Sequence, residues 1–383
     1  MKLTVFVITL FSWIQLTQGR CTKVCLFHVS WVNSVFFDVR SIESNISSLC
    51  SHVIIGYGII VDTENPRIQL YERVNDYLLG LQALKKVNAN FKILLQVQNW
   101  RSMDDINDAY DKMISSINGR RTFVQKIVKL LRDMGFDGIQ IRERHFQRVV
   151  SIRKEHIVFL QELADAFRSE SSTTGKPKLL LFESLYESTN IPLLDSCSDV
   201  MGICRIVDMV TLETFFFFPL RNVSYRHHSR LFGESPLDQH SVNFVTNYVL
   251  SKGCAKEKLL IAILPAPHTF QYNARIYPEG LYLSAGVRSY DVFCNILKEH
   301  ATKIQHLSDQ APYLCTEDWR ENRLYKKFIH YFEDALSLKA KANYINQKGL
   351  GGFIMWEFIL DDSWGACNEG LYPLLRILSQ ECK

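Results

Sequence analysis

The sequence lacks several features that would place its 383 residues in a specialised class of protein. It has no low-complexity run and no short-period repeat, and its hydrophobic and charged fractions, 47% and 22%, are those of a globular chain with a large core. Its ten cysteines include no Cys-x-x-Cys pair, so a zinc site is not indicated, and we expect neither a metal nor a cofactor. Basic residues exceed acidic ones by only four, which does not by itself indicate a nucleic-acid partner.

The beginning of the chain is typical of a secretory signal peptide, Met1–Gly19. Lys2 supplies the positive charge, an apolar segment follows over Leu3–Leu16, and small residues precede the cleavage site. The apolar run is too short to span a membrane, and no later segment has that character. We therefore expect a secreted, extracellular protein with disulfides and no membrane insertion, glycosylated at the sequons of Asn45 and Asn222.

Strand-like runs alternate with helical patterns along the rest of the chain. The expected strands are Val24–Val29, His52–Tyr57, Lys92–Gln98, Asp137–Glu143, Lys178–Ser184, Asp208–Phe215, Lys258–Leu264 and Gly352–Phe358. The expected helices are Leu78–Val87, Phe123–Met134, Ile157–Phe167, Val242–Leu250 and Tyr290–His300. Eight strands alternating with helices predict an α/β fold, a closed (β/α)8 TIM barrel formed by residues 20–383.

The longest gap between expected strands runs from Pro265 to Gly351. A helix near Tyr290 and another near Ala335–Tyr344 flank a stretch that we expect to be irregular. We interpret the region at about 268–345 as a small α+β insertion after the seventh strand, on the mouth of the barrel.

The fourth expected strand carries the most informative residues. Side chains on a strand alternate between its two faces, so Gln140, Arg142 and Arg144 share one face. The stretch resembles the fourth barrel strand of glycoside hydrolase family 18, the chitinases, whose pattern is F-D-G-x-D-x-D-x-E. Asp137 matches the first Asp, whereas Gln140, Arg142 and Arg144 replace the other two Asp and the catalytic Glu.

Other motifs of this family occur in the same order and extend the resemblance over nearly the whole mature chain. They are Cys25 with Leu49–His52, Phe91–Trp100, Ala285–Cys294, and Gly351–Trp356 followed by Asp361, Asp362 and Cys367. The resemblance implies the disulfides Cys25–Cys50 and Cys294–Cys367. The pairing of Cys21, Cys197, Cys204, Cys254, Cys315 and Cys382 stays open, with Cys21–Cys382 as a looser expectation.

The departures from the family pattern gather where the chemistry takes place. In the sixth strand, Glu213, Phe215 and Phe216 stand where the family has M-x-Y-D, and His268 replaces an Arg after the seventh. The resemblance implies a mechanism in which the sugar's acetamido oxygen attacks and the enzyme supplies one acid. A guanidinium at Arg144 stays charged and cannot donate that proton, so we predict that the chain is not an enzyme.

Aromatic residues of the family's sugar cleft are retained. Trp31, Tyr57, Trp100 and Trp356 match such positions, and Trp356 corresponds to the floor on which the reacting sugar stacks. For the run Phe215–Phe218, core packing is favoured over a role in the cleft.

The two arginines on the axial face need partners, because an unpaired buried charge is very costly. We favour internal pairing with Glu213, and Glu183 is a less certain partner because its parity is unclear. The alternative is a pocket for a sulfated, sialylated or uronic glycan. For the loop from Arg221 to Arg230, a solvated loop is favoured over an extended basic surface.

These observations predict a secreted, catalytically inactive chitinase-like protein that binds a glycan in the groove at the barrel mouth, either a chitin oligosaccharide or an acidic glycan. The alternative is a signalling or growth-factor-like protein that has lost sugar binding and contacts a cell-surface receptor. An active chitinase is the least favoured interpretation.

Overall fold

The computed structural model describes residues 21–28, 46–62, 65–70, 74–98, 109–142, 150–185, 191–217, 226–273, 283–320 and 323–383. Within these ranges no helix has both the length and the apolar character needed to cross a bilayer.

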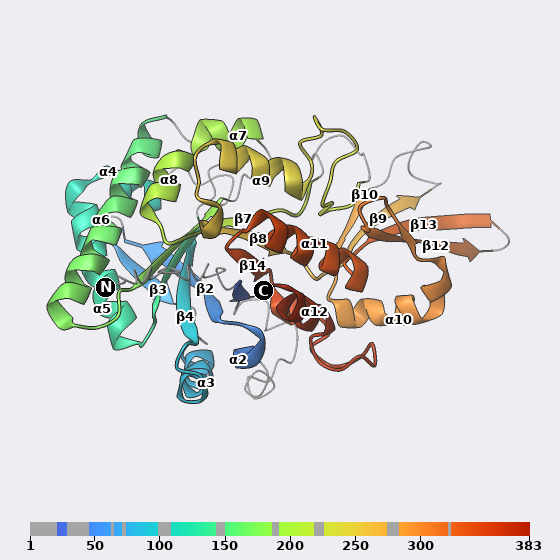
Figure 1. Ribbon diagram of the computed structural model, residues 1–383, viewed down its shortest axis with the longest axis horizontal. Coiled ribbons are helices and arrows are strands. Elements are labelled where there is room, and N and C mark those ends of the chain that lie inside the picture. The colour runs from blue at the N-terminus through green and yellow to red at the C-terminus, as the bar shows by residue number, and fades with distance from the viewer. Residues whose placement is uncertain are drawn as a thin grey trace, which may run out of the picture.

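The described strands form a closed (β/α)8 barrel (Figure 1). The parallel strands are β1 (Thr22–His28), β2 (His52–Val61), β4 (Lys92–Gln98), β5 (Gly138–Arg142), β6 (Leu180–Leu185), β7 (Met209–Leu212), β8 (Leu259–Ile263) and β14 (Gly352–Met355). They are hydrogen-bonded in chain order, and β1 pairs with both β2 and β14, which closes the barrel. A further strand, β3 (Arg67–Leu70), lies antiparallel to β2.

All eight expected barrel strands occur, with ends that differ by a few residues. The sixth is the most shortened, since β7 ends at Leu212 where the pattern extended to Phe215. The second is longer than expected because β2 continues to Val61 in order to pair with β3.

Helices surround the barrel and are stabilised by local capping. They are α2 (Ile46–Leu49), α3 (Val74–Val87), α4 (Ala109–Ser115), α5 (Ile117–Asp133), α6 (Val150–Thr174), α7 (Ile191–Cys197), α8 (Val200–Ile206), α9 (Val242–Ser251), α11 (Ala335–Lys348) and α12 (Pro373–Glu381). In α5, Ser116 Oγ accepts from the backbone N–H of Gly119, and Phe123, Ile127 and Leu131 form one buried stripe at four-residue spacing. The periodicity therefore predicted the buried face, while the cap set the first residue.

The insertion is an antiparallel sheet with a helix packed on one face. Its order is β10 (Leu283–Val287), β9 (His268–Asn273), β13 (Arg323–Tyr331), β12 (Pro312–Arg320) and β11 (Gln305–His306), and α10 (Tyr290–His300) lies beside it. It projects from the barrel on the right of Figure 1. The stretch with Pro312 and Trp319, which we expected to be irregular, is strand β12. That prediction was wrong because Pro312 occupies the first strand position, where a missing N–H is tolerated.

Two apolar layers hold the barrel together. Strand β8 is buried throughout, and alternation sends Leu260 and Ala262 into the barrel and Leu259, Ile261 and Ile263 toward the helices. The inner layer also contains Val24, Ile54, Leu94, Phe182 and Ile354. The barrel centre is thus packed below its mouth, as in other barrels of this size.

Four disulfides join described cysteines. Two are the pairs that the resemblance implied, Cys25–Cys50 and Cys294–Cys367. The others are Cys21–Cys382 and Cys204–Cys254. Cys315 is a free thiol, and nothing is described for the Cys197 side chain.

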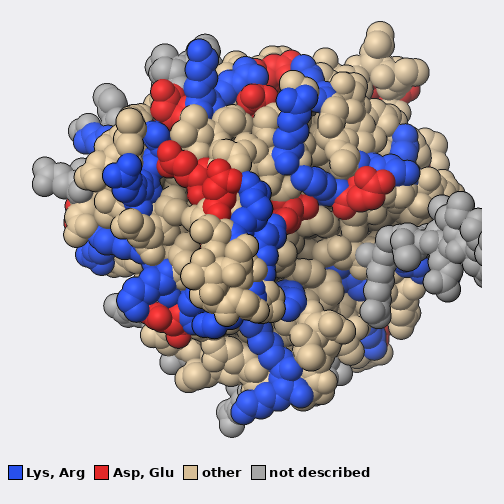
Figure 2. Space-filling view, turned by 60° about the vertical axis from the view of Figure 1, so that its left-hand side comes forward, with Lys and Arg blue, Asp and Glu red and all other residues tan. Residues whose placement is uncertain are grey.

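Charged residues are mixed on the face that carries α4, α5 and α6, where basic groups are interspersed with acidic ones (Figure 2). Ion pairs such as Lys129–Asp133 in α5 and Arg132–Glu170 between α5 and α6 account for part of this mixture. Residues of both signs therefore contribute to this face.

Candidate functional site

Strand β5 presents its polar side chains to the barrel axis. Ile139 and Ile141 belong to the outer core, between the strands and the helices. Gln140 and Arg142 point the other way and contact side chains from the adjacent strand β4 and from the β7 region, two strands along the sheet. The axial parity predicted from the sequence is confirmed for these two residues.

Arg142 forms a buried ion pair with Glu213, as the strand register predicted. Its Nε and one Nη donate to the two carboxylate oxygens of Glu213 at 2.7 and 2.9 Å. Ser184 Oγ donates to the same carboxylate at 2.8 Å. The two side chains are only 8% and 3% exposed, so the pair is desolvated and each charge depends on the other.

The guanidinium of Arg142 also covers the indole of Trp356. Its Cζ lies 4.5 Å from the indole centroid, in a cation–π arrangement. The rings of Phe215 and His28 approach the same indole, with centroids at 5.9 and 5.4 Å. Trp356 is therefore 7% exposed, and the ring that corresponds to the sugar floor of the family is packed against protein.

A second polar chain crosses the barrel beneath this pair. His28 Nδ1 lies 2.5 Å from Glu357 Oε1, and its Nε2 lies 2.8 Å from Gln96 Oε1. Gln96 Nε2 then donates to Gln140 Oε1 at 2.8 Å, and Gln140 Nε2 donates to Thr211 Oγ1 at 3.1 Å. All five side chains are buried, so this chain satisfies polar groups that would otherwise be costly at the barrel centre.

Sequence reasoning identified Gln140 in this chain but missed His28, Gln96, Thr211 and Glu357. The available signal was a polar residue at an inward position on successive strands, where the neighbouring inward positions are apolar. The link from His28 to Glu357 spans 329 residues and depends on closure of the barrel.

Two acidic residues of interest lie away from the axial site. Asp137 precedes β5 at the opposite end of the strand from Arg142, where it accepts from Ile93 N and pairs with Lys85. Glu183, considered as a partner of the arginines, faces the helices instead and lies 3.2 Å from His156 Nε2. Its side chain follows the outward parity of β6, opposite to that of Ser184.

The phenylalanine run is split between the core and the surface. Phe215 and Phe217 are buried, in agreement with the packing that was favoured, while Phe216 is 37% exposed. Phe216 adopts a φ of 62°, and its ring lies 5.6 Å from that of His268. Burial lowers the pKa of His268 to about 4, so this imidazole is neutral where the family has a charged Arg.

Residues 227–231 of the loop between β7 and α9 are buried, which corrects the expectation of a solvated loop for this described part. His227 and His228 are buried and stacked with centroids 4.8 Å apart, and Arg230 is only 9% exposed. His227 Nε2 donates to the carbonyl of Phe332, which follows the insertion sheet. The sequence could not reveal this cover because it comes from a distant part of the chain.

Several predicted residues lie outside the described ranges. These are Trp31, Trp100, Arg144 and the sequon residues Asn45 and Asn222. Tyr57 lies in β2, but its side chain is not described. Their proposed roles in glycan binding, inactivation and glycosylation therefore stay predictions.

Arg142 cannot donate a proton to a sugar at the position that it occupies. A guanidinium stays charged at any working pH. The carboxylate that it contacts, Glu213, accepts hydrogen bonds from Arg142 and from Ser184. In this part of the site the positive charge of Arg142 is paired with the negative charge of Glu213.

Known proteins share this architecture and sequence pattern. The chain is 29% identical over 390 residues to mouse chitotriosidase-1, covering 95% of this chain and 78% of the relative. It is 24% identical over 393 residues to human chitinase-3-like protein 2, covering 95% and 94%. Among solved structures, human YKL-39, described as a pseudo-chitinase with retained chitooligosaccharide binding properties, superposes with a TM-score of 0.76 at 22% identity, covering 94% of this chain and 99% of that one.

The relatives include both chitinases and a pseudo-chitinase, so likeness alone does not decide activity. The profile of "Glycosyl hydrolases family 18" matches residues 23–361, which is most of the chain. The closed barrel, the insertion after β8 and this match together show that the chain belongs to glycosyl hydrolase family 18.

Proposed function

We propose that this protein is a secreted, non-hydrolytic member of the chitinase family that binds a glycan on the outer part of the barrel mouth. The observation that carries the proposal is the buried Arg142–Glu213 pair stacked on Trp356. It replaces a carboxylate of the family's motif with a cation and covers the ring on which the reacting sugar would stack.

Loss of hydrolysis follows from the residue types along β5. Substrate-assisted cleavage needs an acid to protonate the leaving oxygen and a carboxylate to orient the acetamido group. Arg144 stands at the first position and Arg142 at the second, and neither donates a proton at working pH. The amide of Gln140 is already engaged with Gln96 and Thr211.

Glycan binding is supported by aromatic residues that match the family's cleft positions in sequence. Trp31, Tyr57 and Trp100 match cleft positions of the family, and flat apolar sugar faces stack on such rings. The related pseudo-chitinase YKL-39 is described as binding chitooligosaccharides. Since Trp356 is covered, binding here is expected to be shallow and weak and to rest on Trp31 and Trp100.

A titration of the full chain with chitotetraose, followed by tryptophan fluorescence and calorimetry, tests both parts of this proposal. We expect binding that is weakened by Trp100→Ala and no release of product from a chromogenic chitotriose at acidic or neutral pH. Turnover by the wild type that disappears in Glu143→Gln would refute the loss of activity and reveal a rewired acid.

A second function is favoured by the same cover on Trp356, namely action through protein contacts with a cell-surface receptor after sugar binding has been lost. The titration separates the two functions. Binding of chitotetraose that Trp100→Ala abolishes supports the glycan-binding function, whereas its absence up to millimolar concentration supports the protein-contact function.

Secretion is supported by the leader-like segment Met1–Gly19 and by the disulfides, which form in oxidising compartments. Expression of the full chain in a secreting cell, followed by N-terminal sequencing, should yield a mature protein in the medium that begins at Arg20. Retention in the cell with Met1 intact would contradict the proposal.

A further inference from the structure

A cavity of about 400 Å³ lies away from the barrel axis, between the loop that follows β7 and the insertion sheet. We call it the loop–sheet pocket. Its walls include Arg226, Arg230 and Glu234 from the loop, and Tyr313, Lys327 and Tyr331 from β12 and β13. Its size is in the range of small-ligand sites.

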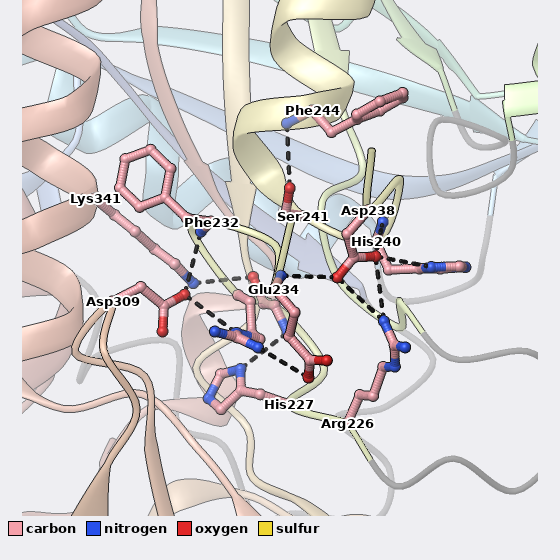
Figure 3. A network of polar contacts seen from close by, with 12 residues as sticks. Arg226, His227, Phe232, Glu234, Asp238, His240, Ser241, Phe244, Asp309 and Lys341 are labelled. Carbon is pink, nitrogen blue, oxygen red and sulfur yellow. Dashed lines mark hydrogen bonds and ion pairs between the residues drawn. The ribbon is translucent and has the colours of Figure 1, made fainter. Parts of the chain in front are cut away.

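The loop wall carries two arginines, and each is fixed by an ion pair with an aspartate that does not line the pocket. Arg226 Nη1 donates to the two oxygens of Asp238 at 3.2 and 3.1 Å, and Asp238 in turn accepts from the backbone N–H groups of Glu234 and His240 (Figure 3). Arg230 Nε donates to Asp309 at 3.4 Å, with a side chain that is 10% exposed. Fixed guanidiniums of this kind lose little freedom when they bind an anion.

Each arginine keeps donors beyond these anchors. A guanidinium has five N–H groups. In the contacts among the described residues, Arg226 uses only Nη1, whereas Arg230 uses Nε on Asp309 and Nη1 on Glu234 at 3.3 Å. The carboxylate of Glu234 is 65% exposed, so a ligand anion in the pocket can replace it on Arg230 without stranding a buried charge.

The sheet wall presents two tyrosines next to an apolar pair. Tyr313 and Tyr331 are directly opposite each other on β12 and β13, with ring centroids 6.3 Å apart, and Cys315 and Ile329 form the next pair on the same face. Lys327 belongs to the same row and lies 3.8 Å from Glu317. An aromatic wall opposite a cationic wall suits a ring that carries an acidic group.

A ligand in the pocket faces more cations than carboxylates, because three of the carboxylates that pair with these cations, Asp238, Asp309 and Glu317, are not among the lining residues. Arg226, Arg230 and Lys327 are cations, and Glu234 is the acidic residue among the described lining. His227 adds no charge, because burial and the nearby Lys341 lower its pKa to about 3 and its two nitrogens contact Phe332 O and Ser229 N.

We propose that the loop–sheet pocket binds an acidic sugar, a hexuronate or sulfated hexose unit, with its anionic group on Arg226 and Arg230 and its ring face on Tyr313 and Tyr331. This site is distinct from the axial network, since none of the network's described residues lines it. The choice of a sugar over another acidic ring rests on the extracellular location proposed above.

The test uses the full mature chain and a heparin-derived disaccharide, measured by calorimetry at fixed ionic strength. Arg226→Gln should weaken binding by about tenfold, the loss expected for one charge-assisted contact. Glu234→Gln should strengthen it severalfold, because it removes a competing carboxylate. Arg121→Gln is the matched control: it removes the same charge from an exposed position on α5 and should leave the affinity unchanged.

Two further arms separate this pocket from general anion binding and from the barrel mouth. Tyr313→Leu should weaken the disaccharide but not inorganic sulfate, and saturating chitotetraose should leave disaccharide binding intact. An equal loss in Arg226→Gln and Arg121→Gln would overturn the proposal, as would a wild type that binds sulfate as tightly as the disaccharide. Binding that survives in Arg226→Gln but is displaced by chitotetraose would place the ligand at the barrel mouth instead.

Discussion

At the scale of single residues, the axial site shows that a buried arginine requires an acidic residue beside it. A cation at Arg142 is stable inside the barrel only with an anion nearby, and Glu213 occupies a position where the family has Met. Ser184 completes the pair by donating to the same carboxylate. Arg142 ends β5, Ser184 lies in the neighbouring strand β6, and Glu213 directly follows β7, the next strand along the barrel.

Glu213→Ala should lower the free energy of unfolding by about 3–5 kcal/mol, because it removes the carboxylate that pairs with the buried guanidinium of Arg142. The double variant Arg142→Met, Glu213→Leu should lie much closer to the wild type, since apolar replacement of a buried ion pair is often nearly neutral. Urea denaturation of the four proteins in this cycle measures the coupling. Wild-type stability of Glu213→Ala in an anion-free buffer would refute the buried pair.

Restoring the acidic motif alone should not restore catalysis. In the variant Arg142→Asp, Arg144→Glu, Gln140 still lacks a carboxylate, and Phe215 and Phe216 still lack the polar groups that orient the acetamido oxygen. Orientation supplies a large part of the rate in such reactions. Release of chromophore from a chitotriose substrate decides the matter, and robust turnover by the double variant would show that the acidic residues of β5 were the only missing parts.

At the scale of elements, the sequence predicted which strand residues face the barrel axis, because this depends on strand periodicity. Gln140 and Arg142 were placed on the axial face and Glu213 opposite them, because alternation is fixed by the backbone. Glu183 was uncertain because the apolar run begins before β6 does. The bond between His28 and Glu357 was not predictable, since it joins residues 329 apart through barrel closure.

The same limit applies to the surface of the barrel. The loop of His227 and His228 reads as polar and solvated from its composition, but the insertion covers it. Burial of this kind is decided by the packing of an element that lies about a hundred residues later. The loop–sheet pocket is likewise formed by two segments that are far apart in the sequence, so no local sequence pattern predicted it.

The insertion sheet should lose stability in mild acid through His330. This side chain joins three strands, since its nitrogens lie 3.0 Å from the hydroxyls of Thr269 and Thr316. Burial, followed by the positive charges of Arg288 and His300, lowers its pKa from 6.5 to about 4. The unfolded chain therefore takes up a proton first as the pH falls. The stabilisation is complete above pH 6.5 and is lost toward pH 4, by up to about 3 kcal/mol.

Urea denaturation of the wild type and His330→Gln at several pH values between 7 and 4.5 measures this effect. The stability advantage of the wild type should shrink as the pH falls. Asp361, whose pKa burial raises to about 7, acts in the opposite sense, and comparison of the two proteins at each pH cancels it. Parallel pH profiles would contradict the assignment to His330.

At the scale of the whole molecule, the chain closes on itself twice. Strand β1 pairs with both β2 and β14, so the first and last barrel strands are neighbours. Cys21 then joins Cys382, just beyond the last residue of α12, across a sequence separation of 361. This disulfide adds a covalent link beside the hydrogen bonds between β1 and β14, which close the barrel.

Removal of the two disulfides Cys21–Cys382 and Cys204–Cys254 should lower the free energy of unfolding by different amounts. The Cys204–Cys254 bridge closes a segment of only 50 residues, whereas Cys21–Cys382 closes nearly the whole chain. Chain-entropy reasoning makes the longer link the more stabilising one, by about 2 kcal/mol. We therefore expect Cys21→Ser, Cys382→Ser to lose more unfolding free energy than Cys204→Ser, Cys254→Ser, as measured by urea denaturation under non-reducing conditions. If the two double variants lose the same amount, the length of the closed loop does not determine the stabilisation, and the terminal bridge contributes no more than the shorter one.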